Sequence, residues 1–205
     1  MTVVERAREA DLLVAATRLF RQRGFHATSM QELGEALGMN RGSLYHYIAS
    51  KDDLLWSILN RAFDLLDARV LPLLDADEPP LPRLAAGIRE HLRVAADHAD
   101  ELSLIQIELR SLPLERRAMM IERRDAYEAR WRSVIEQAIA DGALRPVDVR
   151  LTGIGILSIC NWFTQWYRPD GPQGVDEIAA IFTDLLLAGS LRRPDASATA
   201  QAVPE

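Results

Sequence analysis

A stretch of fourteen residues, GMNRGSLYHYIASK (residues 38–51), gathers hydrogen-bond donors in a chain that is acidic overall. The protein has a formal net charge of -6, yet this stretch holds Arg41, His46 and Lys51 and no carboxylate. Cationic groups and hydroxyls without neighbouring carboxylates are suited to bind phosphate oxygens and the edges of bases. The stretch therefore predicts an anionic partner at this end of the protein.

The side chains of RGSLYHY (residues 41–47) fit the tasks of a helix that enters the major groove of DNA. The forked guanidinium of Arg41 can bind guanine O6 and N7, and Gly42 lets the helix approach the DNA closely. Leu44 is the apolar exception, and we expect it to anchor the helix to the core. The predicted contacts to bases and phosphates are Thr28, Arg41, Gly42, Ser43, Tyr45, His46, Tyr47 and Lys51.

Two short helical segments joined by Gly-Met-Asn position these side chains. Ser29 with Glu32 forms a capping box for the first segment, with Thr28 and Gln31 as the alternative pair, and Asn40 caps the second. The helices expected in this part cover residues 5–22, 29–37 and 41–48, which is the outline of a helix-turn-helix packed on a longer helix. Taken singly, two tyrosines and a histidine on a short helix are more commonly half-buried core residues. The combination of two short helices, a glycine turn and clustered donors without a carboxylate favours DNA binding instead.

Apolar residues recur at helical spacing along the rest of the chain, and no segment alternates apolar and polar residues as a strand does. We therefore expect an all-α protein with an N-terminal three-helix helix-turn-helix domain and a C-terminal helical domain. The further helices are expected at residues 51–74, 81–98, 100–111, 113–141, 146–167 and 175–187. The predicted domains are residues 1–50 and 51–192, followed by a disordered tail at residues 193–205.

Other classes of protein find little support in the sequence. The uncharged run Leu151–Tyr167 contains Asn161 and Gln165, which predicts a buried helix rather than a membrane span. The first residues carry charges where a signal peptide has an apolar run, so we expect a cytoplasmic location and no membrane partner. His91 and His98 are two helical turns apart, which is too far for a pair of metal ligands. Because no phosphate-binding glycine loop and no G-x-S-x-G motif is present either, no enzyme, metal site or cofactor is predicted.

Residues 18–55 resemble the N-terminal DNA-binding domain of TetR-family transcriptional regulators. The first shared motif, F-x-x-x-G-(F/Y)-x-x-T-(S/T), is matched by Phe20, Gly24, Phe25, Thr28 and Ser29. The second, G-S-L-Y-x-H-F-x-S-K-x-x-L, is matched by Gly42, Ser43, Leu44, Tyr45, Ser50, Lys51 and Leu54. Tyr47 and Ile48 depart from the usual His and Phe, but Tyr can still donate to a phosphate and Ile can still fill a core site.

This resemblance implies a homodimer whose C-terminal domain binds a small molecule. The last two long helices of each chain would pair with those of the partner in a four-helix bundle. Two recognition helices would then bind double-stranded DNA at a palindromic operator, in major grooves about one helical turn apart or a little more. Binding of the small-molecule effector would change their spacing and release the DNA.

The segment NWFTQWYRPDGP (residues 161–172) is similar to a subgroup of TetR-family regulators of lipid and steroid catabolism in actinobacteria, which respond to acyl-CoA thioesters. This similarity implies a ligand-released repressor with an acyl-CoA-type effector. The alternative is a repressor that responds to a drug or metabolite without CoA, as in the control of efflux genes. Ser158 stands where members of the subgroup often carry a basic residue.

A CoA thioester requires an apolar space for its acyl part and cations for its phosphates. Arginines recur in residues 113–141, but acidic residues interleave with them at helical spacing, so a salt-bridged solvated face is the alternative. The apolar residues that could form the cavity wall could equally belong to an ordinary core or to the dimer interface. Glu108 fits either a buried polar position or a solvent-facing one. The candidate ligand-binding residues are Ile105, Leu109, Met120, Tyr127, Trp131, Trp162 and Trp166.

Overall fold

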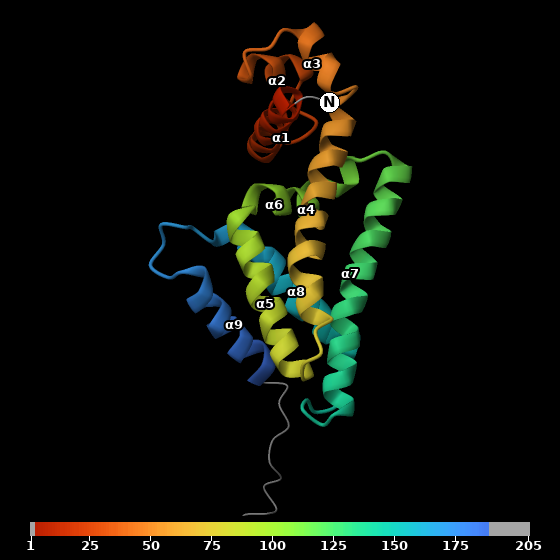
Figure 1. Cartoon of the computed structure of the whole chain (residues 1–205), viewed down its shortest axis with the longest axis vertical. Coiled ribbons are helices and arrows are strands. Elements are labelled where there is room, and N and C mark those ends of the chain that lie inside the picture. Colours follow the sequence, from red (N-terminus) through yellow and green to blue (C-terminus); the bar gives the residue numbers. More distant parts are fainter. Residues whose placement is uncertain (1–2, 189–205) are drawn as a thin grey trace, which may run out of the picture.

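The computed structural model describes residues 3–188, and all of their regular secondary structure is helical (Figure 1). This confirms the predicted all-α fold. The elements are α1 (Val3–Arg23), α2 (Met30–Ala36), α3 (Arg41–Tyr47), α4 (Lys51–Leu74), α5 (Pro80–Asp97), α6 (Ala99–Glu108), the 3₁₀ turn η1 (Leu109–Ser111), α7 (Leu114–Ala140), α8 (Val149–Trp166) and α9 (Val175–Ala188). The tail predicted at residues 193–205 lies outside the described residues.

Local side-chain chemistry determines where the short helices α2 and α3 begin. Ser29 and Glu32 form the capping box that the sequence predicts, so Ser29 and not Thr28 is the N-cap of α2. The Asn40 carboxamide oxygen accepts the Ser43 backbone N–H at 2.8 Å and caps α3. Between the two helices, Gly38 has a φ of +62°, a conformation that other residues rarely adopt. The turn that sets the angle between α2 and α3 thus depends on this glycine.

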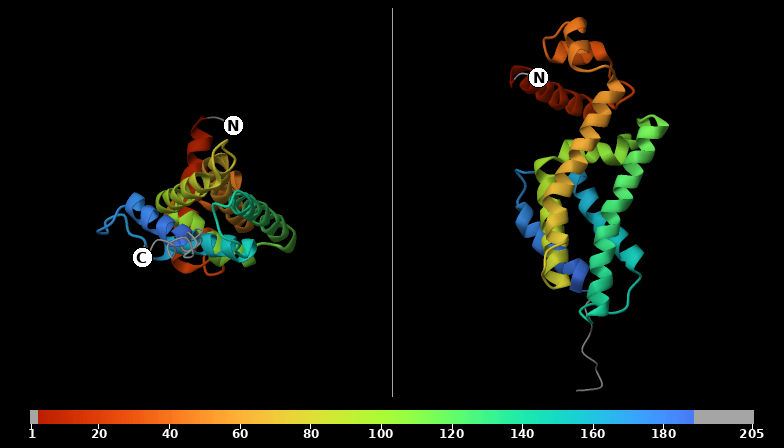
Figure 2. Two further views of the ribbon diagram at one scale, coloured as in Figure 1. Left: turned by 90° about the horizontal axis from the view of Figure 1, so that it is seen from below. Right: turned by 45° about the vertical axis from the view of Figure 1, so that its right-hand side comes forward.

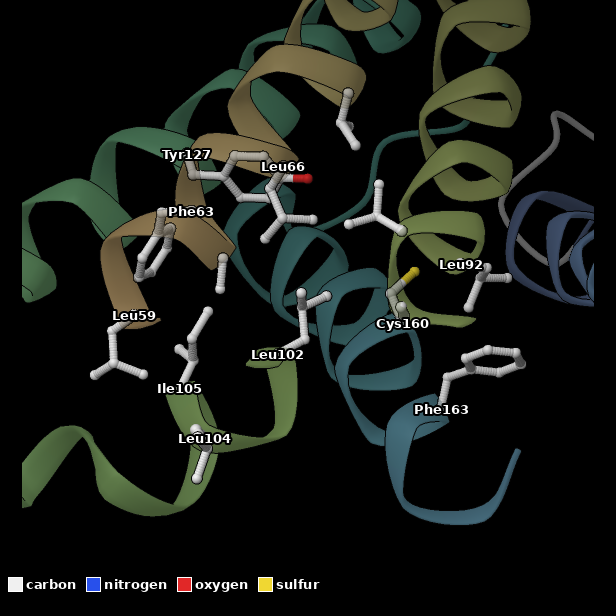
Figure 3. Packing of buried hydrophobic residues seen from close by; sticks show 14 of the residues in the cluster. Leu59, Phe63, Leu66, Leu92, Leu102, Leu104, Ile105, Tyr127, Cys160 and Phe163 are labelled. Carbon is white, nitrogen blue, oxygen red and sulfur yellow. The ribbon is translucent and has the colours of Figure 1, made fainter. Parts of the chain in front are cut away.

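Helices α1, α2 and α3 form a group at one end of the molecule, and α4 runs from this group into a bundle with α5, α6, α7 and α8 (Figures 1 and 2). The bundle is held by apolar side chains from each of these helices, several of which are shown in Figure 3. Leu59, Phe63 and Leu66 project from α4 toward Ile105 of α6 and Tyr127 of α7. No helix within residues 3–188 has the length and apolar character needed to cross a membrane.

Two predicted boundaries in the C-terminal half are wrong. The helix expected to begin at Pro146 begins at Val149, because the Asp148 carboxylate caps it by accepting the Leu151 N–H at 2.8 Å. The helix expected to continue to Ser111 ends at Glu108 and tightens into η1. Leu112, which precedes Pro113, adopts an extended conformation, as residues before proline usually do.

Candidate functional site

The polar side chains described on α3, from Ser43 to Tyr47, are exposed or half-buried. Leu44 is fully buried and fixes the helix on the core, as the sequence predicts. Tyr45 is 41% exposed. Among the other predicted contacts on α3, Gly42 and His46 are exposed and Ser43 and Tyr47 are half-buried. Arg41 is the first residue of the helix, at the end that meets base edges in helix-turn-helix proteins. The surface of α3 can therefore approach DNA without moving a core residue.

Lys51 and Thr28, two further predicted phosphate contacts, have hydrogen-bond partners within the chain. The Lys51 ammonium donates to the backbone oxygens of Phe25 and Thr28, both at 2.8 Å, and lies 4.4 Å from the centroid of the Phe25 ring. Thr28 is 1% exposed, and its hydroxyl donates to the Gly24 oxygen at 2.9 Å. Because these polar groups already have internal partners, they position the turn between α1 and α2.

The same turn is bound from the other side by the C-terminal end of α6. One carboxylate oxygen of Glu108 accepts the Phe25 backbone N–H at 2.9 Å, and the other accepts the Ser111 hydroxyl at 2.7 Å. The Ser111 hydroxyl oxygen also lies 3.1 Å from Nε2 of His26. Glu108 is buried, which answers the question that the sequence left open. Its carboxylate joins the bundle to the group that carries α3.

A cavity of about 510 Å³ lies between the helices of the bundle. Its buried part is formed by apolar side chains together with His91 of α5 and Tyr127 of α7, and Figure 3 shows the Tyr127 ring projecting over Leu66. Its outer part includes the exposed side chains of Arg110, Arg124 and Arg150. The full lining is Phe63, Leu66, His91, Leu102, Ile105, Gln106, Leu109, Arg110, Arg124, Tyr127, Glu128, Arg150, Ile154, Leu157, Ser158 and Asn161.

The buried polar groups of the cavity are uncharged at neutral pH. Nδ1 of His91 lies 3.1 Å from the Tyr127 hydroxyl. Burial lowers the pKa of His91 to about 4, and the Asn161 side chain acts in the opposite direction. Burial also raises the pKa of Tyr127 well above its usual value. The cavity is therefore neutral at its buried end and positively charged at its outer end, where Arg110 and Arg150 outnumber the single lining carboxylate, Glu128, and Arg124 is paired with Asp125 at 2.8 Å.

Predicted ligand-binding residues separate into three groups. Those that line the cavity are Ile105, Leu109 and Tyr127. Met120 and Trp131 are buried in the core outside the cavity lining. Trp162 and Trp166 are exposed on another face of α8, where they form a groove with Phe182 of α9. This difference arises because the two tryptophans and the cavity-lining Asn161 project in different directions from the same helix, and Ser158 lies between them and lines both the cavity and the groove.

Sequence reasoning missed His91, Asn161, Arg110 and Arg150 as lining residues. In the sequence, His91 was a candidate only for a metal site, and the candidate cations were the arginines of residues 113–141, which contain α7. Most of those arginines are instead bonded to carboxylates, for example Arg123 to Asp67 at 2.7 Å. The salt-bridged alternative therefore describes much of that helix. Only proximity in the fold distinguishes Arg110 and Arg150 from the other arginines.

The outer faces of α8 and α9 carry apolar side chains that the single chain leaves exposed. Trp162 is 67% exposed and Leu185 is 65% exposed. Leu151, Trp166 and Ile181 extend the same set. An apolar area of this kind, distributed over two adjacent helices, is typical of a surface that another protein covers.

Comparison with known proteins finds a family match in each of the two predicted domains. Residues 12–58 match a family described as "Bacterial regulatory proteins, tetR family", and residues 77–190 match "Tetracyclin repressor-like, C-terminal domain". The chain is 30% identical over 185 residues to the HTH-type transcriptional repressor KstR2 of Mycobacterium tuberculosis (strain ATCC 25618 / H37Rv), covering 89% of this chain and 92% of that protein.

Solved structures agree with this comparison. The ketosteroid transcriptional regulator KstR2 of Mycobacterium tuberculosis superposes with a TM-score of 0.86 at 28% identity, covering 91% of this chain and 96% of the other. AibR, solved in complex with isovaleryl coenzyme A and operator DNA, gives a TM-score of 0.81 at 31% identity, covering 88% and 98% of the two chains.

Proposed function

Since the chain belongs to the TetR family of bacterial transcriptional regulators, we propose that it is a homodimeric repressor of lipid or steroid catabolism genes, released from its operator by an acyl-CoA-type effector. Membership of the family confirms the prediction of a DNA-binding regulator rather than an enzyme. Such a regulator acts in the cytoplasm, where the bacterial chromosome lies.

Operator binding is assigned to residues 1–50, and ligand binding and dimerisation to residues 51–192. The exposed surface of α3 supports the first assignment, because Tyr45 and His46 can donate to DNA while Leu44 holds the helix in place. Arg41, at the start of α3, is the residue we assign to reading a base edge. Lys51 and Thr28 contribute indirectly by holding the turn before α2.

The charge distribution of the cavity is the observation that carries the proposed effector. Its apolar buried part suits an acyl group, and the exposed guanidinium groups of Arg110 and Arg150 at its outer end suit the phosphates of a CoA moiety. The relative AibR was solved with isovaleryl coenzyme A, and KstR2 is described as a ketosteroid regulator. These relatives support a thioester effector and a role in lipid or steroid catabolism.

A homodimer is supported by the exposed apolar residues of α8 and α9. Trp162 and Leu185 cost free energy in water and are stabilised when a second copy covers them. Pairing of these two helices with the same helices of the partner would form a four-helix bundle. The dimer would present two α3 helices to a palindromic operator.

Helix α6 offers the route from effector to DNA. Ile105 and Gln106 line the cavity, while Glu108 on the same helix accepts the Phe25 N–H in the turn before α2. An effector that displaces α6 would therefore also displace the group of α1, α2 and α3, through the hydrogen bond between Glu108 and Phe25. When the α1–α3 groups of both protomers move in this way, the two α3 helices no longer match the spacing of successive major grooves. The repressor then dissociates from the operator.

Fluorescence anisotropy tests the proposal on DNA from upstream of the protein's own gene, with a scrambled duplex of equal length as control. We expect salt-sensitive, sequence-specific binding that is reversed by one member of a panel of medium-chain, long-chain and steroid CoA thioesters, and not by CoA alone. Specific binding that no thioester reverses would retain the repressor and favour the alternative, an effector without CoA. Absence of specific binding would contradict the operator-binding assignment.

Matched variants test whether the cavity is the site of the effect. Arg110→Gln and Arg150→Gln should each weaken thioester binding while leaving operator binding intact, because both side chains line the cavity and neither lies on α3. Arg130→Gln is the control, since Arg130 lies on α7 outside the cavity lining and is paired with Asp75. Equal thioester affinity in all three variants would exclude the proposed phosphate contacts.

A further inference from the structure

Two side-chain nitrogens of the described residues are fully buried without a hydrogen-bond partner, and both lie in one group of rings. They are Nε2 of His91 and Nε1 of Trp131. The ring centroids of His91 and Tyr127 are 6.0 Å apart, and those of Tyr127 and Trp131 are 6.3 Å apart. Native structures rarely leave such atoms unpaired, and an unpaired one indicates a missing partner. Of these two residues, only His91 lines the cavity.

The two ring nitrogens of His91 differ in their partners. A buried imidazole that stays neutral has one nitrogen that donates and one that accepts. Nδ1 lies 3.1 Å from the Tyr127 hydroxyl, which can serve it as donor or as acceptor. Nε2 has no partner within the chain, so it is the nitrogen left to bind a ligand oxygen.

Asn161 of α8 is half-buried and lines the same cavity. Its side chain is close enough to His91 to raise the pKa of the imidazole against the effect of burial. A carboxamide both donates and accepts, so it can bind the same ligand oxygen as Nε2 of His91. The surrounding walls, Phe63, Leu66 and Leu102, offer no polar group.

We propose that the buried end of the cavity is a subsite for an uncharged oxygen, a hydroxyl or a carbonyl, carried by the hydrocarbon part of the effector and bound by Nε2 of His91 and the side chain of Asn161. A carboxylate does not fit this subsite, because a buried anion needs a cation and the arginines of the cavity are exposed at its outer end. The inference rests on the proposed thioester function and specifies it. The effector is an oxygen-bearing acyl-CoA rather than a simple fatty acyl-CoA.

Isothermal titration calorimetry of the full-length protein tests the subsite with pairs of thioesters that differ in one hydroxyl. The probes are octanoyl-CoA and ω-hydroxyoctanoyl-CoA, with the corresponding hexanoyl and decanoyl pairs to vary the reach. We expect the hydroxylated member of at least one pair to bind about tenfold more tightly to the wild type, which corresponds to one satisfied hydrogen bond. The variant His91→Leu should bring this ratio to about one and still bind the plain thioester. His98→Leu is the matched control, because His98 lies at the end of α5 outside the cavity lining.

Failure of this inference is distinct from failure of the proposed function. Thioesters that bind with equal affinity within every pair, unaffected by His91→Leu, would overturn the oxygen subsite and leave the thioester effector standing. If no thioester binds, the subsite is tested without CoA by adding 1-octanol to protein labelled with nitrogen isotope in its histidines. A change in the His91 side-chain NMR signal, identified by its loss in His91→Leu, would support the subsite, and an unchanged signal would overturn it.

Discussion

At the scale of single residues, Lys51 shows how a side chain suited to bind phosphate can serve the fold instead. Its ammonium is bonded to the backbone oxygens of Phe25 and Thr28. We expect Lys51→Met to lower the free energy of unfolding by about 1 to 3 kcal/mol, because a charged group that satisfies two carbonyls is lost. A phosphate contact would instead lower the slope of log affinity against log salt by about one. Urea unfolding and salt titrations of operator binding measure both, and a reduced slope with unchanged stability would contradict our assignment.

Arg41 is the first residue of α3, and we assign it to reading a base edge. Arg41→Ala should weaken binding to the operator by roughly 1 to 3 kcal/mol if the guanidinium reads a guanine, and it should reduce discrimination against a changed base pair. Tyr47→Ala is the comparison, since loss of a phosphate donor weakens binding to all sequences alike. Anisotropy on operators with single base-pair changes separates the two effects. An affinity of Arg41→Ala equal to that of the wild type would remove the assignment.

His91 makes stability depend on pH in a defined window. Its pKa is about 4 in the folded protein and 6.5 in the unfolded chain, so between these values only the unfolded chain binds the proton. Stability therefore falls as the pH falls through this window, by about 3 kcal/mol in total, and this residue contributes no such change above pH 6.5. Urea unfolding of wild type and His91→Leu across this range measures the effect. The advantage of wild type over the variant should shrink toward pH 4, and a constant difference would contradict the prediction.

At the scale of elements, α6 belongs to both the cavity and the junction with the DNA-binding group. Glu108→Ala removes the acceptor of the Phe25 N–H, and Glu108→Gln retains a carbonyl oxygen that can accept it. We expect Glu108→Ala to keep thioester affinity but lose most of the effector's influence on operator binding, a coupling of typically about 1 to 3 kcal/mol. Glu108→Gln should retain most of this coupling. Anisotropy with and without effector measures it, and full release of Glu108→Ala by the effector would exclude α6 as the route.

At the scale of the whole molecule, the exposed faces of α8 and α9 determine whether the protein works as a pair. Trp162→Glu and Leu185→Glu place charges on surfaces that a single chain leaves in water, so they should not unfold the monomer. They should prevent dimerisation, because a charge buried at an apolar interface lacks a partner. Analytical ultracentrifugation should show monomers, and operator affinity should fall as the second half-site contact is lost. Leu114→Glu is the control, since Leu114 is 73% exposed on α7; dimeric Trp162→Glu would exclude this face.

The sequence by itself determined the helical class, the helix-turn-helix and the family resemblance. The information for these is local. The capping box of Ser29 and Glu32 and the cap at Asn40 act within one helical turn, and Gly38 sets the turn between the two helices. Such interactions depend only on residues that are close in the sequence, so the residue types within a few positions are sufficient to predict them.

Only the tertiary structure decided what the polar residues do. Lys51 bonds to carbonyls more than twenty residues away, Glu108 reaches Phe25 across 83 positions, and the buried end of the cavity combines His91, Tyr127 and Asn161 from three helices. Periodicity shows which residues share a face of one helix, but it does not show which faces meet. That choice results from the packing of many apolar side chains between distant segments, and it separates the cavity wall from the exposed tryptophans of the same helix.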